Sequence, residues 1–350
     1  MSLYLNALTI LLAVCLIWKY EYNKGFYESY LIKSVADSMK GFLAIVVLLH
    51  HISQRLTGEY LLFSLFYDAG FIAVASFFFF SGYGLQKQRI NKGLEYRRDY
   101  FKKRVFTILI PFGIVVVLQW LNNRAMGRYY PIKAVFNAMF VGDQPMMVMY
   151  SWYVVVILAF YIIFGLLLYI IPNDNRRVIT CVIGINILYV AICIWKGIGT
   201  YWFNAVHLLW IGMIAAQYEQ VLMDWFKKRY ALCLILSAFV FVLSYFLIRT
   251  KMPAFITTYL GDMIIKSICA VAFVVLFLLS NLKVKIGNYI LSLLGKISFE
   301  IYLMQGIFIS GLAYHISFAN EVLWAYGIIV STIIGAILLY CVNKIIRKIL

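Results

Sequence analysis

Long apolar runs, separated by short polar or basic segments, recur along the entire chain. A window of about 19 residues finds eleven stretches apolar enough to cross a bilayer, where a helix needs about 20 such residues. They fall near residues 3–19, 40–55, 66–86, 105–121, 151–171, 178–195, 201–217, 231–248, 264–280, 298–314 and 323–343. The runs lack the two-residue alternation of membrane β-strands. The pattern therefore predicts an all-α polytopic transmembrane bundle of about 10 to 11 helices.

Composition supports this class of protein. The chain has 350 residues, of which 64% are hydrophobic and only 13% are charged. A soluble domain is about half apolar and a quarter charged, so a soluble fold is excluded. The longest connection between runs, near residues 122–150, is too short for a separate soluble domain.

The basic residues indicate an orientation. Cytoplasmic loops of membrane proteins are enriched in Lys and Arg. If the segment 87–104 is cytoplasmic, alternation places 23 of the 31 Lys and Arg residues on the cytoplasmic side. The N-terminus is then expected outside and the C-terminus inside a multi-pass bacterial cell membrane. This topology explains the net charge of +17, and we expect no nucleic acid as a partner.

One apolar run carries unusual polar residues at both ends. Residues 39–54 read MKGFLAIVVLLHHISQ. On a helix, eleven residues span about 16 Å and return to nearly the same face, so Lys40 and His51 share one side. His50 points in a different direction. Lys40 is then at the cytoplasmic entrance and His51 is deep in the membrane.

A histidine at membrane depth is a candidate functional residue, although it can also bond a neighbouring helix. Imidazole suits proton abstraction near neutral pH, and Lys40 and Gln54 extend the polar line along the helix. His207 and His315 are interpreted as structural residues. His50 and His51 are adjacent and lack an HExxH motif or paired carboxylates, so we predict no metal site.

Five segments, in order, resemble the acyltransferase 3 family of integral membrane O-acyltransferases. The first is DSMKGFLAIVVLLHHIS, in which the family has a basic residue, usually Arg, separated by ten residues from a His; the matching positions here are Lys40, in place of Arg, and His51. The others are FFFFSGYGLQKQR, YFKKRVFTILIPF, SWYVVVILAFYIIF and LGKISFEIYLMQGIF. The resemblance covers about residues 35 to 343. It divides the chain into an extra N-terminal helix and linker, 1–34, and an acyltransferase-3-like transmembrane domain, 35–350.

Two positions depart from the family pattern. The basic segment usually has a second Arg three residues after the first, where this chain has Thr107 after Arg104. The late helix usually has a His after Tyr-Leu, where this chain has Gln305. We assign Gln305 no role.

The resemblance implies a membrane O-acyltransferase. It would move an acyl group, usually acetyl, from cytoplasmic acyl-coenzyme A to a hydroxyl of a cell-envelope polysaccharide or lipid-linked sugar. Acyl-coenzyme A is then a donor substrate, and we expect no permanently bound cofactor. The lipid bilayer is the remaining partner, and the oligomeric state is left open.

The resemblance also implies roles for individual residues. His51 is expected to be catalytic, either as general base or as carrier of the acyl group. A donor with several phosphates favours cations at the inner rim, and the candidates are Lys40, Lys103 and Arg104. Supporting candidates are His50, Asp37, Ser81, Gly82 and Glu300. For four of these a structural role is preferred. Asp37 neutralises Lys40, and Glu300 pairs with Lys296 one turn earlier. Ser81 and Gly82 could offer a hydroxyl and a backbone amide to the oxyanion, but close helix packing is the preferred role of both.

Two other functions fit the same features. A transporter or flippase of a glycan or lipid precursor also uses a polytopic bundle and a histidine at membrane depth. An O-succinyltransferase of an exopolysaccharide would differ only in the acyl pocket, which the sequence does not describe.

Overall fold

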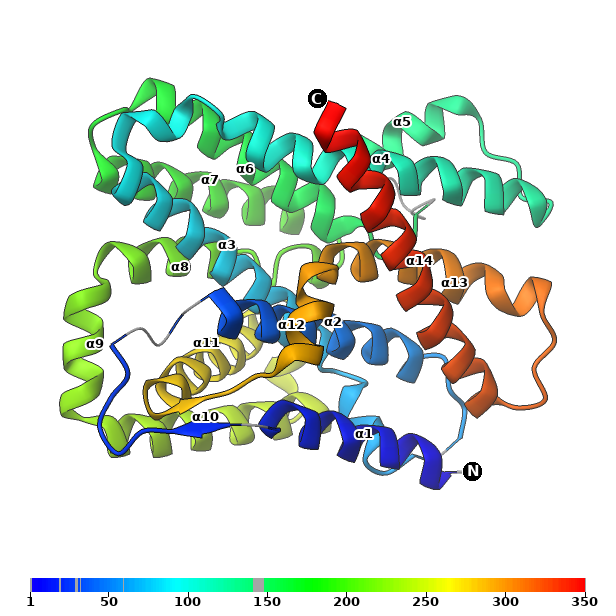
Figure 1. The fold of residues 1–350 in the computed structure, drawn as a ribbon, viewed down its shortest axis with the longest axis horizontal. Coiled ribbons are helices and arrows are strands. Elements are labelled where there is room, and N and C mark those ends of the chain that lie inside the picture. Colours follow the sequence, from blue (N-terminus) through cyan, green and yellow to red (C-terminus); the bar gives the residue numbers. More distant parts are fainter. Residues whose placement is uncertain are drawn as a thin grey trace.

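The structure is a computed structural model that describes residues 2–18, 20–28, 31, 33–58, 60–140 and 148–349. Figure 1 shows an almost entirely helical chain. The α-helices are α1 (Ser2–Ile17), α2 (Lys33–Ser53), α3 (Gly70–Lys92), α4 (Tyr100–Ala125), α5 (Ile132–Phe140), α6 (Trp152–Ile170), α7 (Asn175–Trp195), α8 (Leu208–Gln217), α9 (Glu219–Lys228), α10 (Tyr230–Thr250), α11 (Tyr259–Lys283), α12 (Tyr289–Lys296), α13 (Ser298–His315) and α14 (Glu321–Ile349). The shorter elements are the 3-10 helices η1 (Phe63–Phe66), η2 (Gly93–Arg97), η3 (Thr200–Trp202) and η4 (Ala254–Thr257), and the strands β1 (Glu21–Tyr22) and β2 (Val284–Lys285).

The predicted all-α membrane bundle is confirmed. A bilayer offers backbone groups no water, so apolar segments satisfy their own N–H and C=O groups by forming helices. Among the described residues, seven helices are long and apolar enough to cross a membrane, or eight if α12 and α13 form one broken span. The seven are α2, α4, α6, α7, α10, α11 and α14.

Several predicted spans differ in detail from the helices. The run at 201–217 becomes helical only from Leu208, so α8 has ten residues and a length of about 15 Å, too short to cross alone. The residues before it, Phe203 to Val206, are buried without forming a helix. The late span is broken between α12 and α13, which are bent by 70°. Helix α1 is also shorter than a full span.

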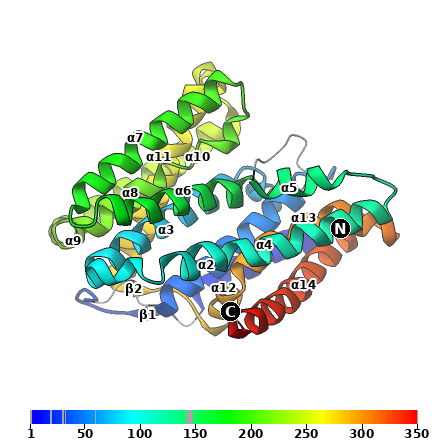
Figure 2. The same ribbon diagram turned by 90° about the horizontal axis from the view of Figure 1, so that it is seen from above.

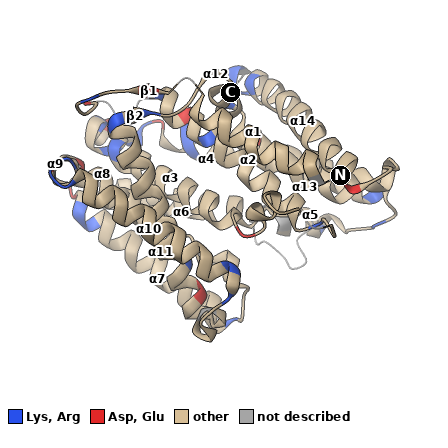
Figure 3. Cartoon of the chain, turned by 90° about the horizontal axis from the view of Figure 1, so that it is seen from below, with Lys and Arg blue, Asp and Glu red and all other residues tan. Residues whose placement is uncertain are grey.

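One end of the bundle gathers the predicted cytoplasmic segments, and we call it the basic end. The side chain of Arg89 in α3 donates to Asn175 Oδ1 of α7 at 2.7 Å. Arg347 near the end of α14 donates to the Thr107 carbonyl of α4 at 3.0 Å. Strands β1 and β2 pair antiparallel beside the end of α11. Figure 3 shows Lys and Arg positions in α9, near β1 and β2 and at the end of α14. Lys19, counted in the prediction, lies outside the described residues.

Contacts between helix ends also define the opposite end. His315 of α13 lies 3.3 Å from Asn122 of α4, and Glu321 of α14 accepts hydrogen bonds from the segment after α2. Seen from above, α7, α10 and α11 form one group of helices, and α4, α13 and α14 form another. The two groups diverge towards this opposite end (Figure 2).

Paired glycines let two helix pairs approach closely. A Cβ on Gly82 of α3 would lie 1.8 Å from the Leu209 carbonyl oxygen of α8, and one on Gly212 would lie 2.1 Å from the Phe79 oxygen. The same arrangement joins α2 to α12, where a Cβ on Gly41 would lie 2.1 Å from the Leu291 oxygen. Small residues are the usual means of close helix packing in membranes. These contacts fix α2 and α3, which carry the candidate site.

Candidate active site

Helix α2 carries the basic residue and both histidines of the predicted line. It is continuous from Lys33 to Ser53, so Lys40 and His51 are about 16 Å apart along its axis. Lys40 Nζ lies 3.1 Å from Asp37 Oδ1, which confirms the predicted neutralisation by Asp37. The Lys40 side chain remains 41% exposed. The helix therefore places a half-exposed ion pair at the basic end and the imidazoles towards the other end.

A cavity of about 520 Å³ surrounds the two histidines. His50, His51 and Gln54 of α2 form one wall. The remaining walls come from segments far apart in the sequence, and their polar and aromatic residues are Asp68, Phe71, Tyr150, Trp152, Tyr201, Asn204, Lys266 and Tyr302. A concave site lined by aromatic rings and a few converging polar groups is typical of small-molecule binding. The two histidines thus share one cavity, although they point in different directions from α2.

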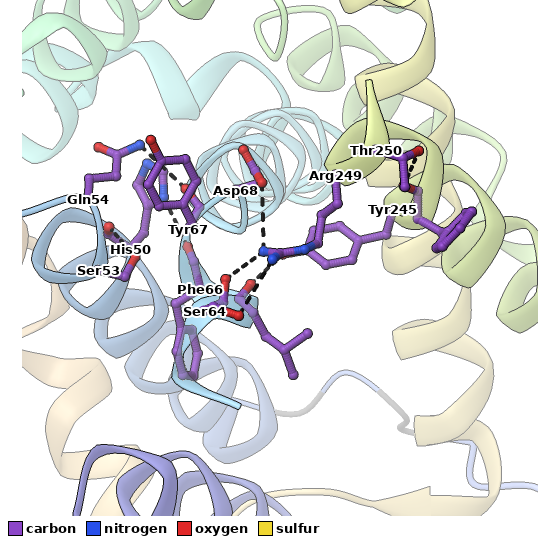
Figure 4. Close-up of polar contacts among 12 residues, drawn as sticks. His50, Ser53, Gln54, Ser64, Phe66, Tyr67, Asp68, Tyr245, Arg249 and Thr250 are labelled. Carbon is purple, nitrogen blue, oxygen red and sulfur yellow. Dashed lines mark hydrogen bonds and ion pairs between the residues drawn. The ribbon is translucent and has the colours of Figure 1, made fainter. Parts of the chain in front are cut away.

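The ring of His50 is held by a backbone carbonyl. Its Nδ1 lies 3.0 Å from the Phe66 oxygen (Figure 4). Because a carbonyl only accepts, this contact assigns the proton to Nδ1 and leaves the lone pair on Nε2. Gly70 at the start of α3 makes room for the ring, since a Cβ there would lie 2.6 Å from Nε2.

The segment around η1 that supplies this carbonyl is fixed from two other helices. Asn6 Oδ1 of α1 accepts from the N–H of Leu62 at 2.9 Å and from that of Phe63 at 3.1 Å. From α10, Arg249 donates to the Ser64 carbonyl and lies 3.8 Å from Asp68 Oδ2. Tyr245 of α10 donates to the Leu65 carbonyl (Figure 4). These contacts hold the Phe66 carbonyl in front of His50.

His51 is held differently, by an aromatic stack. Its ring lies 3.5 Å from that of Tyr150, with the planes at 17°. Tyr150 has a positive φ of 66°, and the Tyr302 hydroxyl donates to its carbonyl. A non-glycine residue in this conformation is uncommon. His51 Nδ1 is buried and has no hydrogen-bond partner among the described residues.

Arg104 and Lys103 have separate environments at the basic end. Lys103 is 66% exposed and lies 2.8 Å from Asp99 Oδ2. Its hydrogen bond lowers the pKa of the Asp99 carboxyl. Arg104 instead lies among Tyr96 and Tyr100; burial raises the pKa of the Tyr96 hydroxyl, and the charge of Arg104 acts in the opposite direction. No ion pair between Arg104 and a carboxylate is found in the described part of the chain.

The comparison with known families agrees with this arrangement. A family model described as Acyltransferase domain matches residues 35–341. The chain belongs to the acyltransferase 3 family. No curated protein and no solved structure that was compared matches it. Helix α1 and β1 precede the part matched to the acyltransferase 3 family.

Two supporting residues expected from the family are not at the cavity. Gly82 packs on the Leu209 carbonyl, as the packing role predicts, and its own N–H is inside α3. Ser81 follows Gly70 by eleven residues on the same helix, about 16 Å along its axis. Its hydroxyl interacts with Tyr153. The structure therefore does not bring Ser81 or Gly82 together with the two histidines.

The predicted ion pair of Glu300 with Lys296 is wrong. The 70° bend between α12 and α13 puts these residues on different helices, whereas the prediction assumed one continuous helix. Glu300 is buried, and Asn343 Nδ2 of α14 donates to its Oε1 at 3.4 Å. Glu300 thus joins α13 to α14.

Sequence reasoning missed several residues of the cavity wall. Lys266 of α11 lines the cavity, and its Nζ lies 2.6 Å from Asp262 Oδ1. A lysine beside an apolar run is a usable signal, and Lys266 is one of the eight Lys and Arg residues that the predicted topology leaves outside the cytoplasm. Tyr150 and Asp68 lie in connections and gave no periodic signal. Within the described residues, no group of three or more His, Cys, Asp or Glu side chains could hold a metal ion.

Proposed function

We propose that the protein transfers an acyl group, first of all acetyl, from cytoplasmic acyl-coenzyme A to a hydroxyl of a cell-envelope polysaccharide or lipid-linked sugar. The observation that carries the proposal is the 520 Å³ cavity with two imidazoles in a chain of an acyltransferase family. Acyl transfer to a hydroxyl needs a group that removes its proton, and imidazole has the appropriate basicity. The aromatic and polar wall offers contacts for an acceptor.

The donor is proposed to bind from the basic end. Arg104 is the first candidate for its phosphates, because its guanidinium faces tyrosines and a bidentate contact with phosphate is favourable. Lys40 would have to share its charge with Asp37. Lys103 is the weakest of the three, because it is exposed and paired with Asp99. In this proposal the basic end faces the cytoplasm of a bacterial plasma membrane, with the N-terminus outside and the C-terminus inside.

His51 is placed in contact with the reacting groups, because it lines the cavity and is about 16 Å from Lys40 along α2. It can act on the acceptor hydroxyl directly or receive the acyl group first. The stack on Tyr150 fixes the plane of its ring, and a ring held in one orientation favours either role.

The test uses purified protein in detergent with radiolabelled acetyl-coenzyme A. We expect slow release of free coenzyme A, or label retained on the protein, from the wild type and not from His51→Ala. His315→Gln is a matched control, because His315 is an exposed histidine at the end of α13. Succinyl-coenzyme A is assayed in parallel to identify the acyl group. If neither donor binds or turns over, the proposal is wrong and transport of a glycan or lipid precursor becomes the better explanation.

A further inference from the structure

We propose that His50 is the proton acceptor of the transfer reaction, and that its Nε2 takes the proton of the acceptor hydroxyl. This inference rests on the proposed acyltransferase function. It assigns different roles to two neighbouring imidazoles, whose ring centroids lie 4.8 Å apart in one cavity. His51 then has the remaining role of contacting the acyl group.

The first argument is the state of the His50 ring. Its Nδ1–H donates to the Phe66 carbonyl at 3.0 Å, so Nε2 is the nitrogen that can accept a proton. When Nε2 becomes protonated, the Nδ1 bond to the carbonyl is retained and becomes charge-assisted. The charged ring therefore keeps a partner that is already in place.

The second argument is the contrast with His51. Its Nδ1 is buried without a hydrogen-bond partner in the described part of the chain, and its ring is stacked on Tyr150. A protonated His51 would leave a charged N–H in this environment, and an unpaired buried donor is unfavourable. The same proton is thus better accommodated on His50.

The third argument is the charge around each ring. The negative charge of Asp68 favours a protonated His50, and the positive charge of Lys266 opposes it. The charges acting on His51 are those of His50 and Arg55, and both oppose its protonation, whereas a hydrogen bond with Gln54 favours it. Asp68 and Lys266 line the cavity with both histidines, and the other titratable groups on its wall are Tyr150, Tyr201 and Tyr302.

The reaction step balances as follows. The acceptor oxygen forms a bond with the thioester carbonyl carbon while its proton moves to His50 Nε2. The carbon–sulfur bond then breaks, and its electron pair goes to sulfur. The proton on Nε2 passes to the coenzyme A thiolate, which leaves as the thiol and restores neutral His50. Water can replace the acceptor hydroxyl in the same step, which gives slow hydrolysis of the donor.

The experiment compares His50→Asn, His51→Asn and His315→Gln as purified proteins with radiolabelled acetyl-coenzyme A. The amide of Asn can donate to the Phe66 carbonyl in place of Nδ1, but it has no basic nitrogen. We expect His50→Asn to bind acetyl-coenzyme A with wild-type affinity and to release coenzyme A about 10²- to 10⁴-fold more slowly. His315→Gln is expected to match the wild type in both measurements.

The pH dependence of coenzyme A release gives a readout that a structural role would not move. Activity falls at low pH when the base becomes protonated. Asp68→Asn removes a charge that favours protonation, so the acidic limb should move to lower pH. Lys266→Gln removes a charge that opposes it, so the limb should move to higher pH. Both variants keep His50 and His51, and they remain informative if His50→Asn fails to fold.

Three results would overturn the inference. His50→Asn could retain more than about a tenth of the wild-type rate, which is too much for loss of a general base. The acidic limb could stay unchanged in Asp68→Asn and Lys266→Gln. If the wild type shows neither binding nor release with acetyl- or succinyl-coenzyme A, the proposed function fails and the inference fails with it. In the first two cases the wild-type acyltransferase activity remains, so the two failures are distinguishable.

Discussion

Replacing Gly82 by Ala tests whether this glycine serves packing or chemistry. The new Cβ would lie 1.8 Å from the Leu209 carbonyl oxygen, and ordinary contact begins near 3.4 Å. Helices α3 and α8 would have to separate locally by about 1.6 Å. Overpacking of this kind costs about 1–3 kcal/mol, and a backbone carbonyl cannot move aside as a flexible side chain can. Ala also gains about 1 kcal/mol of helix propensity over Gly. We expect a net loss of up to about 2 kcal/mol, the upper end of the overpacking cost less the gain in helix propensity.

Gly84, two positions after Gly82 in α3, is the matched control. The nearest atom to its added Cβ is Arg104 Nη2 at 4.0 Å, so Gly84→Ala meets no steric barrier. It should keep or slightly raise stability, by up to about 1 kcal/mol. The assay is unfolding of both variants and the wild type in mixed detergent and dodecyl sulfate micelles, followed by tryptophan fluorescence. Coenzyme A release is measured on the same samples.

The outcome separates the two roles of Gly82. If packing is the role, Gly82→Ala unfolds at a lower dodecyl sulfate fraction, and its activity falls with the folded fraction. A Gly82→Ala protein as stable as the wild type but inactive would refute the packing argument. It would mean that Gly82 acts at the reacting groups, against its position inside α3.

Three further predictions concern the frame of the site and the donor. Asn6→Ala removes the acceptor for the Leu62 and Phe63 N–H groups, so we expect a loss of about 1–2 kcal/mol in the same unfolding assay and slower coenzyme A release. Unchanged release would show that α1 does not support His50. Tyr302→Phe removes the hydrogen bond to the Tyr150 carbonyl, worth about 1 kcal/mol, and should slow release with little change in helix packing. A stable variant with wild-type release would contradict this. Arg104→Ala should weaken equilibrium binding of acetyl-coenzyme A by about 1.5–3 kcal/mol, whereas Lys103→Ala should change it less than twofold. Equal effects of both variants would show that the basic end acts only through its total charge.

The helices followed from the apolar runs, because a bilayer leaves an apolar segment little alternative to helical hydrogen bonding. The exceptions to this rule are apolar segments whose backbone is not a continuous helix, because hydropathy does not report backbone conformation. The run at 201–217 is apolar throughout, yet it contains η3 and a buried non-helical segment before α8. The bend between α12 and α13 is likewise absent from the pattern of apolar residues. Transfer energies measure apolar burial and not the direction of the backbone, and neither segment is one straight helix.

The candidate site was only partly predictable for a related reason. His51 and Lys40 could be identified because they share one helix, where spacing determines direction. The stack of His51 on Tyr150 and the contact of His50 with the Phe66 carbonyl join different segments of the chain. Local spacing does not reveal such contacts. The prediction therefore found the helix that carries the imidazoles, but not the groups that distinguish one imidazole from the other.

Helix α1 is linked to His50 through hydrogen bonds to η1. It precedes the part of the chain matched to the family, and its residues still pack into the bundle, since Leu5 is fully buried. Asn6 binds two N–H groups at η1, and the Cys15 carbonyl accepts from Asn288 Nδ2 at the other end of α1. The carbonyl that orients His50 belongs to Phe66, the last residue of η1, three positions after Phe63. A hydrogen-bonded chain thus runs from Asn6 through η1 to His50. A helix outside the part matched to the family can therefore support the geometry of the proposed proton acceptor without contacting the substrate.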